Sequence, residues 1–451
     1  MGRLGILGAC TLLAALSGPV HAAEITHVAS AAETNKTIDV DLSIRWDRTQ
    51  KRVRITREQP DPAASPPIGA IIDQTALRYT EISNAIVPRM AIGIFNDLEI
   101  HVEWPYVLAD DVGWRQGLVY GNPSTAIYNG TAPGTGVSPS GNPCTAGTAP
   151  DACPMFPYSP PPTVYHGGKM GDLTAGVTWG ILSDKRDDTK PFWLVGFDLT
   201  FPTAERYDPA GGRDPNNWLS PFAVPAKRAP IGDQAWKYDF FTALSKRIGG
   251  MDPYFRAHVT IERPGANAYS NCLHAAQYAE GPVAAAQAQF ASWAPANCSV
   301  WGDRAGPQLP TVTGIVFGTE IVPYEDRREG QKVTIDVRIT ADYTSSARWY
   351  NELTDATGKI LHTDPFGTIG GRIGLYLRAS EVVSLRAAAS FETQTAHFLT
   401  GEKPGASDYL SNPTNPNLNP NFDARYDAPG NRFRATEVSI FTLSIAGVLQ
   451  F

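Results

Sequence analysis

Residues 433–451, FRATEVSIFTLSIAGVLQF, decide the fold class of this chain. From Phe441 to the final residue, Phe451, every odd position is apolar or glycine, whereas the even positions include threonine, serine and glutamine. A period of two is typical of a β-strand with one apolar and one more polar face. The stretch therefore predicts a final strand that ends the chain on an aromatic residue.

This strand resembles the C-terminal signal strand of bacterial outer-membrane β-barrels, which ends in Phe and is read by the barrel-assembly machinery. The residues that carry the resemblance are Phe441, Leu443, Ile445, Leu449 and Phe451. The usual pattern has a glycine where this chain has Ala446, with Gly447 next to it. The alternative is an ordinary edge strand of a β-sandwich, so the rest of the chain has to decide between the two.

The first residues have the features of a secretory signal. Arg3 precedes an apolar run over 6–16, and Val20-His21-Ala22 has the small-x-small pattern of a cleavage site. We therefore expect a signal peptide over 1–22 and a single domain over 23–451.

The composition favours strands joined by turns. The chain has 41 Gly, 37 Pro and only 18% charged residues, which is unusual for a helical protein. Beyond residue 22 no apolar run approaches the ~20 residues of a membrane-spanning helix. A net charge of -7 without a basic stripe argues against nucleic acid as a partner.

Four cysteines remain after the predicted cleavage, in two close pairs. Cys144 and Cys153 form one pair and Cys272 and Cys298 the other, each within a stretch rich in Gly, Pro, Asn or Ala. In an oxidising compartment this spacing predicts two local disulfides. No CxxC spacing accompanies them, so we expect no metal site, and no motif for a cofactor is present.

Alternating segments predict about twelve strands, joined by connections that alternate between short and long. The long loops are expected at 107–168, 203–232, 264–310, 345–365 and 396–430, with a flap at 51–58. If 51–58 and 76–83 pair separately, the count becomes fourteen. Short turns at one rim and long loops at the other are the arrangement of outer-membrane barrels, with short periplasmic turns and long extracellular loops. We therefore predict an all-β, up-and-down antiparallel transmembrane β-barrel in the bacterial outer membrane, in contact with its lipid.

In such a barrel the polar face of each strand lines the lumen. The candidate lumen residues are Arg89, Glu99, His101, Glu103, Arg256, His258, Arg338, Arg372, Arg386 and Glu392. Two hypotheses remain open. The lumen is either a salt-bridged structural interior or a selective conduit in which Arg89, Arg338, Arg372 and Arg386 oppose Glu99, Glu103 and Glu392.

We do not expect an enzyme. The run Ser345–Asn351 resembles the Ser-containing run of the outer-membrane phospholipase in composition, but no His precedes it at strand spacing. His101 between Glu99 and Glu103 could act as a base, although a histidine within a charged network is the more common arrangement.

Three short motifs are similar to the phenol meta-pathway outer-membrane transporter family. The first is IFNDLEI (94–100) with Pro105-Tyr106-Val107. The second is GGKMGDL (167–173) with Thr178-Trp179, and the third is Phe201-Pro202-Thr203. The similarity is densest over about 84–262, and Ala204 stands where the family pattern has Gly. The resemblance implies a barrel that moves small, often hydrophobic molecules across the outer membrane.

The expected function is therefore passage of a small organic solute through or along the barrel wall. The alternative is a surface adhesion or structural barrel whose disulfide-held loops bind a partner. Deleting 140–156 or 272–298 would separate the two.

Overall fold

The computed structural model describes most of the chain. The described residues are 23–29, 39–60, 71–95, 97–119, 122–123, 161, 163–183, 189–209, 228–274, 294–326, 328–409, 412, 415–423 and 426–451. The predicted signal peptide, 1–22, lies outside them, as do Cys144 and Cys153.

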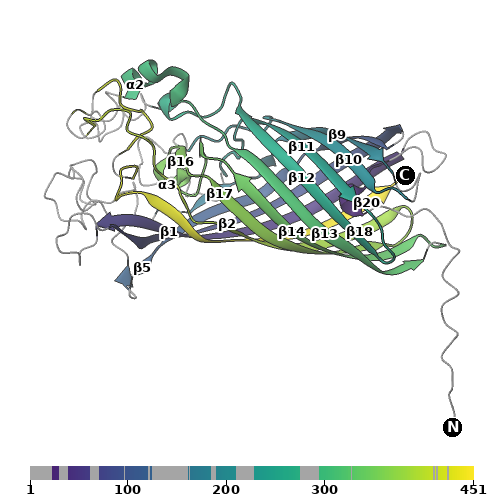
Figure 1. The fold of residues 1–451 in the computed structure, drawn as a ribbon. Helices are drawn as coiled ribbons and strands as arrows, with labels where there is room; N and C mark the ends of the chain where they lie inside the picture. The colour runs from purple at the N-terminus through teal and green to yellow at the C-terminus, as the bar shows by residue number, and fades with distance from the viewer. Residues whose placement is uncertain are drawn as a thin grey trace, which may run out of the picture.

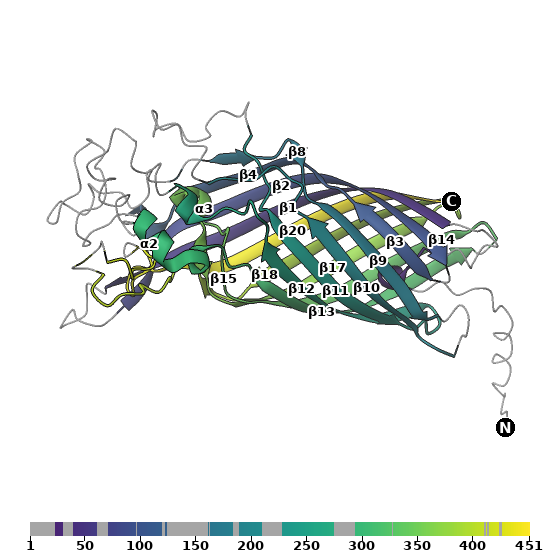
Figure 2. The ribbon, with the colours of Figure 1, turned by 90° about the horizontal axis from the view of Figure 1, so that it is seen from above.

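Twelve antiparallel strands close into a barrel (Figures 1 and 2). They are β1 (Asp39–Pro60), β2 (Ile71–Phe95), β3 (Leu98–Glu103), β9 (Leu173–Leu182), β10 (Phe192–Phe201), β11 (Ala235–Ser245), β12 (Met251–Pro264), β13 (Thr311–Asp326), β14 (Gln331–Thr344), β17 (Phe366–Arg378), β18 (Val383–Gln394) and β20 (Phe433–Gln450). Each strand pairs with its neighbour along the chain, and β1 closes the ring by pairing with both β2 and β20. The backbones of Val40 and Phe451 exchange two further hydrogen bonds at the closure.

The shorter elements extend the wall or lie at the end of the barrel that carries the long loops, except η1, which lies inside the barrel. They are η1 (Glu24–Thr26), β4 (Tyr106–Gln116), β5 (Leu118–Val119), β6 (Asn122–Pro123), β7 (Val164–His166), β8 (Lys169–Met170), η4 (Asn271–His274), α2 (Ala294–Trp301), η6 (Gly302–Ala305), β15 (Ala347–Trp349), α3 (Thr354–Thr357), β16 (Leu361–Thr363) and β19 (His397–Phe398). Figure 1 shows α2, α3 and β16 at one end of the barrel and the C terminus at the other. We call these the loop end and the turn end.

The twelve-strand prediction is confirmed, and the fourteen-strand alternative is wrong. Residues 51–58, expected as a flap, are the second half of β1, and 76–83 belong to β2; the two strands pair from Asp39 to Pro60. Residues 107–116, expected in a loop, continue the wall as β4. Pro105 separates β4 from β3, since proline has no N–H to donate to a ladder.

The outer surface of the barrel is apolar near the turn end. Ile44 is 63% exposed and Ile373 is 64% exposed, and Phe441, Ile445 and Leu449 of the final strand also face outward. Apolar side chains can line the outside of a closed barrel only where lipid surrounds it, because closure leaves no unpaired edge in the hydrocarbon. This is an outer-membrane barrel, with the turn end toward the periplasm and the loop end outside the cell.

The pattern inverts toward the loop end. On β1 the inward row changes from Asp41 and Arg45 to Val53 and Ile55, which are fully or almost fully buried, while Arg52 faces outward and is exposed. This inversion explains why 51–58 does not show the pattern of a membrane strand. We infer that the loop end stands above the hydrocarbon, with water outside and an apolar core within.

That apolar core is completed by a loop that folds back into the barrel, comprising β15, α3 and β16. Its Leu353, Ala356 and Leu361 pack against inward side chains of the wall, including Ile55 and Leu77. We call residues 345–365 the inward loop. The sequence predicted a loop here but gave no indication that it enters the barrel.

A disulfide joins Cys272 of η4 to Cys298 of α2 at the loop end, as predicted. Among the described residues, no helix has the length and apolar content needed to cross a membrane.

Candidate functional site: two chambers in the lumen

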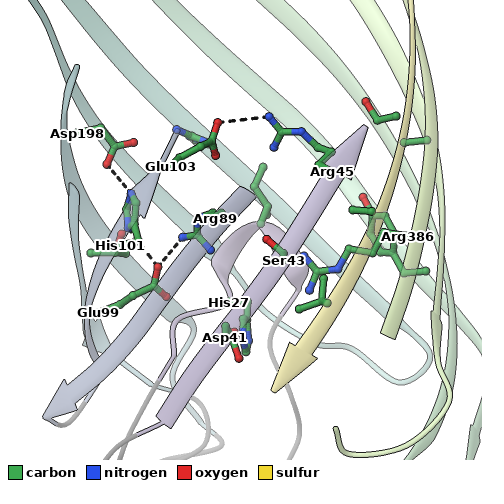
Figure 3. Close-up of a pocket in the computed structure, with 18 of the residues that line it drawn as sticks. His27, Asp41, Ser43, Arg45, Arg89, Glu99, His101, Glu103, Asp198 and Arg386 are labelled. Atoms are coloured by element: carbon green, nitrogen blue, oxygen red, sulfur yellow. Dashed lines mark hydrogen bonds and ion pairs between the residues drawn. The ribbon is translucent and has the colours of Figure 1, made fainter. Parts of the chain in front are cut away.

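The lumen contains a cavity of about 420 Å³ near the turn end, which we call the turn-side chamber. Charged side chains from eight strands line it, together with Ile25 and His27 of the N-terminal segment. The charged residues of the wall are Asp41, Arg45, Arg89, Glu99, Glu103, Asp198, Arg256, Arg338, Arg372 and Arg386. Figure 3 shows several of them pointing into the space enclosed by the strands.

One side of this chamber is a paired acidic wall. Arg89 donates to Glu99 across 2.6 Å, and His101 lies between two carboxylates, with Nδ1 3.2 Å from Glu99 and Nε2 3.0 Å from Asp198 (Figure 3). Glu99 is 3% exposed and His101 is 6% exposed. Because these charges neutralise one another, this side of the chamber offers a solute little free charge.

Gly176 makes the contact between His101 and Asp198 possible. It lies on β9, opposite His101 on one side and Asp198 on the other. A Cβ atom at this position would overlap both side chains, so only glycine leaves them room to meet over the strand.

The same arrangement recurs on the other side of the barrel. Gly314 on β13 lies between His258 of β12 and Asp342 of β14, and a Cβ there would overlap both. The histidine Nε2 and the carboxylate are 3.7 Å apart. The barrel therefore uses one device twice, a histidine and an aspartate that meet over a glycine.

The opposite side of the turn-side chamber is an arginine wall. Arg338 binds Asp336 through Nε at 2.8 Å and also donates to the Tyr376 hydroxyl at 3.1 Å. Arg372 lies directly opposite Arg338 on the neighbouring strand. The Nε of Arg372 is buried and has no hydrogen-bond partner among the described residues.

Arg256 is also only partly satisfied. A carboxylate oxygen of Asp239 lies 3.7 Å from its Nη2, and its guanidinium lies 4.5 Å from the centre of the Phe241 ring. Its Nε likewise lacks a hydrogen-bond partner in the described part of the chain. The arginine wall thus contains two guanidinium groups, those of Arg256 and Arg372, whose hydrogen-bonding capacity the described residues do not fully use.

Eight of the ten predicted lumen residues line this chamber. His258 and Glu392 do not line it, although His258 pairs with Asp342 and Glu392 packs against Gly370. The expectation that arginines oppose Glu99 across the lumen is wrong for Arg89, which pairs with Glu99 along one wall.

Sequence reasoning missed the β1 contribution. Asp41, Ser43 and Arg45 line the chamber, and Arg45 contacts Glu103 at 3.4 Å. The alternation of β1 placed them on a polar face, so the signal was present.

A second cavity, of about 440 Å³, lies toward the loop end, and we call it the loop-side chamber. Its wall includes the aromatic residues Tyr79, Tyr207, Trp349, Tyr350 and Phe366. Three of these five, Tyr207, Trp349 and Tyr350, come from the inward loop or another long loop, which no periodic pattern could place.

Charged groups fix the inward loop beneath this chamber. Lys51 of β1 donates to Glu352 across 2.7 Å, and the Trp114 indole N–H donates to the Glu352 carbonyl at 2.9 Å. Burial acts to raise the pKa of the Glu352 carboxyl, but the Lys51 ammonium outweighs it and holds that pKa below its ordinary value. His166 lies 3.2 Å from Asp355, which fastens α3 to β7.

The run Ser345–Asn351 belongs to this inward loop. The Ser345 hydroxyl accepts the Thr311 N–H at 2.8 Å, and Asn351 donates to the Leu399 carbonyl at 2.9 Å. Both groups therefore hold the loop in place. Within the described ranges, no three His, Cys, Asp or Glu side chains are placed to hold a metal ion.

No protein-family model matches the chain, and no curated protein matches it. Among solved structures, an outer membrane channel from Pseudomonas putida F1 is similar, with 10% identity, a TM-score of 0.42 and coverage of 91% of this chain and 95% of that one. The β domain of the Bordetella autotransporter BrkA has 8% identity, a TM-score of 0.33 and coverage of 91% and 99%. A Pseudomonas aeruginosa FadL homologue has 9% identity, a TM-score of 0.33 and coverage of 92% and 90%. At such low identities and scores we draw no conclusion from these likenesses about what the barrel carries.

Proposed function

We propose that this barrel is a diffusion channel for small organic solutes across the outer membrane, with a preference for solutes that carry a carboxylate. The observation that carries the proposal is the arginine wall of the turn-side chamber. Arg256 and Arg372 line the cavity, and the Nε of each is buried without a hydrogen-bond partner in the described part of the protein, so the wall does not fully satisfy either guanidinium. A buried donor without an acceptor is costly, so such groups favour a solute that accepts hydrogen bonds.

The charge balance of the chamber supports the same preference. Six arginines and four carboxylates line it: Arg45, Arg89, Arg256, Arg338, Arg372 and Arg386 against Asp41, Glu99, Glu103 and Asp198. The four carboxylates have partners within the protein, and Arg338 binds Asp336, whereas the Nε groups of Arg256 and Arg372 lack a hydrogen-bond partner among the described residues. Guanidinium groups bind carboxylates through paired N–H donors, which suits them to the recognition of organic acids.

The loop-side chamber suits the remainder of such a solute. Tyr207, Trp349 and Tyr350 give it flat apolar surfaces, and a solute that enters from outside would meet these before the arginines. The order of the two chambers therefore favours molecules with both an apolar or aromatic part and an acidic part.

Swelling of proteoliposomes with benzoate, benzyl alcohol and benzylamine tests the proposal, because the three solutes share a ring and differ in charge. We expect benzoate to enter fastest and its advantage to fall about tenfold, or ~1.4 kcal/mol, in the Arg256→Gln/Arg372→Gln variant. Arg48→Gln is the matched control, since Arg48 faces outward and is exposed. An unchanged order of the three rates in the double variant would contradict the role of the arginine wall.

The adhesion alternative makes a different forecast. If the loop held by Cys272–Cys298 binds a partner and the barrel only anchors it, deleting 272–298 abolishes binding and leaves solute entry unaltered. Conductance that exceeds the lipid background in planar bilayers, in the full-length protein, would support the channel.

A further inference from the structure

Residues 23–29, ahead of the first strand, lie inside the barrel. η1 and the three residues after it are outside the closed sheet, yet Ala23, Thr26 and Ala29 are fully buried. This stretch shows no strand or helix periodicity, so the sequence gave no reason to place it in the lumen.

The segment crosses the lumen from one wall to the opposite one. Ala23 packs against Tyr254 of β12 and Val316 of β13, whereas His27 lies 3.2 Å from Asp41 of β1. In the order of the ring, six strand steps separate β1 from β12, which is half of the circumference. The segment is therefore a crossbar at the turn end.

Two further sets of contacts hold the middle and the end of this crossbar. The Thr26 hydroxyl lies 2.7 Å from the Ser245 hydroxyl of β11, and Val28 packs against Phe192 and Leu194 of β10. Past them, the Ala29 N–H donates to Glu99 at 2.8 Å. None of these contacts belongs to the strand pairing, so their loss would break no hydrogen bond of the barrel ladder.

The crossbar occupies groups of the turn-side chamber itself. Ile25 and His27 form part of the chamber wall, and Asp41 and Glu99, which the crossbar contacts, line the same cavity. A solute that leaves this chamber toward the periplasm meets the crossbar. The segment and the solute thus compete for one space.

We propose that residues 23–29 are a tethered gate that closes the turn end of the lumen and withdraws when a solute passes. The proposal rests on the channel function above. Residues 23–29 take no part in the strand ladder, so the gate can swing aside while the twelve-stranded wall stays intact.

A disulfide lock tests the gate. Because the hydroxyl oxygens of Thr26 and Ser245 are 2.7 Å apart, the Thr26→Cys/Ser245→Cys variant places two sulfur atoms within bonding reach. We expect the oxidised variant to conduct about tenfold less than the wild type in planar bilayers and to recover with reductant. The single variants and the wild type, each with and without reductant, control for Cys272–Cys298, and mass spectrometry confirms the new bond.

A release variant completes the test. Val28→Asp places a charge against Phe192 and Leu194, so the crossbar should detach and conductance should rise. A locked barrel that conducts like the wild type would overturn the gate and leave the channel standing. Reaction of a soluble maleimide with Thr26→Cys in the Val28→Asp background shows that the crossbar has been released. If no form of the barrel conducts ions, including this released form, the channel function is overturned and the gate with it.

Discussion

Arg338 and Arg372 lie directly opposite each other on β14 and β17, and Asp336, which is fully buried, binds Arg338. Like charges in this cross-strand position repel each other. The pair is therefore asymmetric, because one guanidinium holds the wall together and the other is available to the lumen.

This asymmetry predicts opposite effects of the same substitution at the two positions. Arg338→Gln leaves the Asp336 carboxylate buried without its cation, and we expect a loss of about 3–5 kcal/mol in unfolding free energy. Arg372→Gln relieves the repulsion, so its stability should stay within about 0.5 kcal/mol of the wild type or rise. Urea unfolding in lipid vesicles measures both, and equal destabilisation by the two variants would contradict this assignment.

The glycines beneath the His–Asp contacts give a second prediction. Gly176→Ala and Gly314→Ala force the histidine and aspartate apart, because the added Cβ overlaps both side chains. We expect each to cost about 1–3 kcal/mol in unfolding free energy, as overpacked sites do. Gly371→Ala is the matched control, since a Cβ there makes only an ordinary contact, 3.5 Å from the Arg338 carbonyl oxygen. If all three variants unfold alike, the glycines are not required for the contacts.

The inward loop should respond to acid. The pKa of Glu352 is lower in the folded protein than in the unfolded chain, so the folded state binds fewer protons and is favoured above the ordinary carboxyl pKa of about 4.3. This contribution is lost as the pH falls below that value and through the folded pKa. Limited proteolysis at pH 3 and pH 7 should therefore show faster cleavage within 345–365 at the lower pH.

Two variants isolate the Glu352 contribution. Glu352→Gln should weaken the difference between pH 3 and pH 7, because it removes the titrating group. Lys51→Met should expose the loop even at pH 7, since a buried carboxylate that loses its partner costs about 3 kcal/mol. A loop equally resistant in Lys51→Met would show that this ion pair does not hold it.

The last residue makes a separate prediction about assembly. The Phe451 side chain is 51% exposed on the outside of the barrel, while its backbone closes the ring against Val40. Phe451→Ala keeps the backbone and removes the exposed ring, so we expect less barrel in the outer membrane but a purified barrel of nearly unchanged stability. Heat-modifiable mobility on gels measures both quantities. A variant that assembles normally would contradict the role of Phe451 as an assembly signal.

Alternation along the strands was sufficient to predict the barrel and most of its interior. Period two places Glu99, His101 and Arg338 on the inward face whatever their partners are, and all three line the turn-side chamber. The role of Gly176 could not be predicted, because it depends on the register of three strands at once. The inward loop and the crossbar over 23–29 have no periodic pattern, so their places follow from tertiary packing alone.

The change in polarity along the two faces of β1 helps to fix the register in which the strand pairs. Ile44 faces lipid and Arg45 the lumen, whereas farther along the strand Arg52 faces water and Val53 the apolar core. A slip of one residue would exchange both rows at once, which moves Arg45 into lipid and Val53 into water. The first error costs about 2–4 kcal/mol near mid-membrane and the second about 1.5 kcal/mol. The register of this single strand is therefore fixed at one end by lipid and at the other end by water.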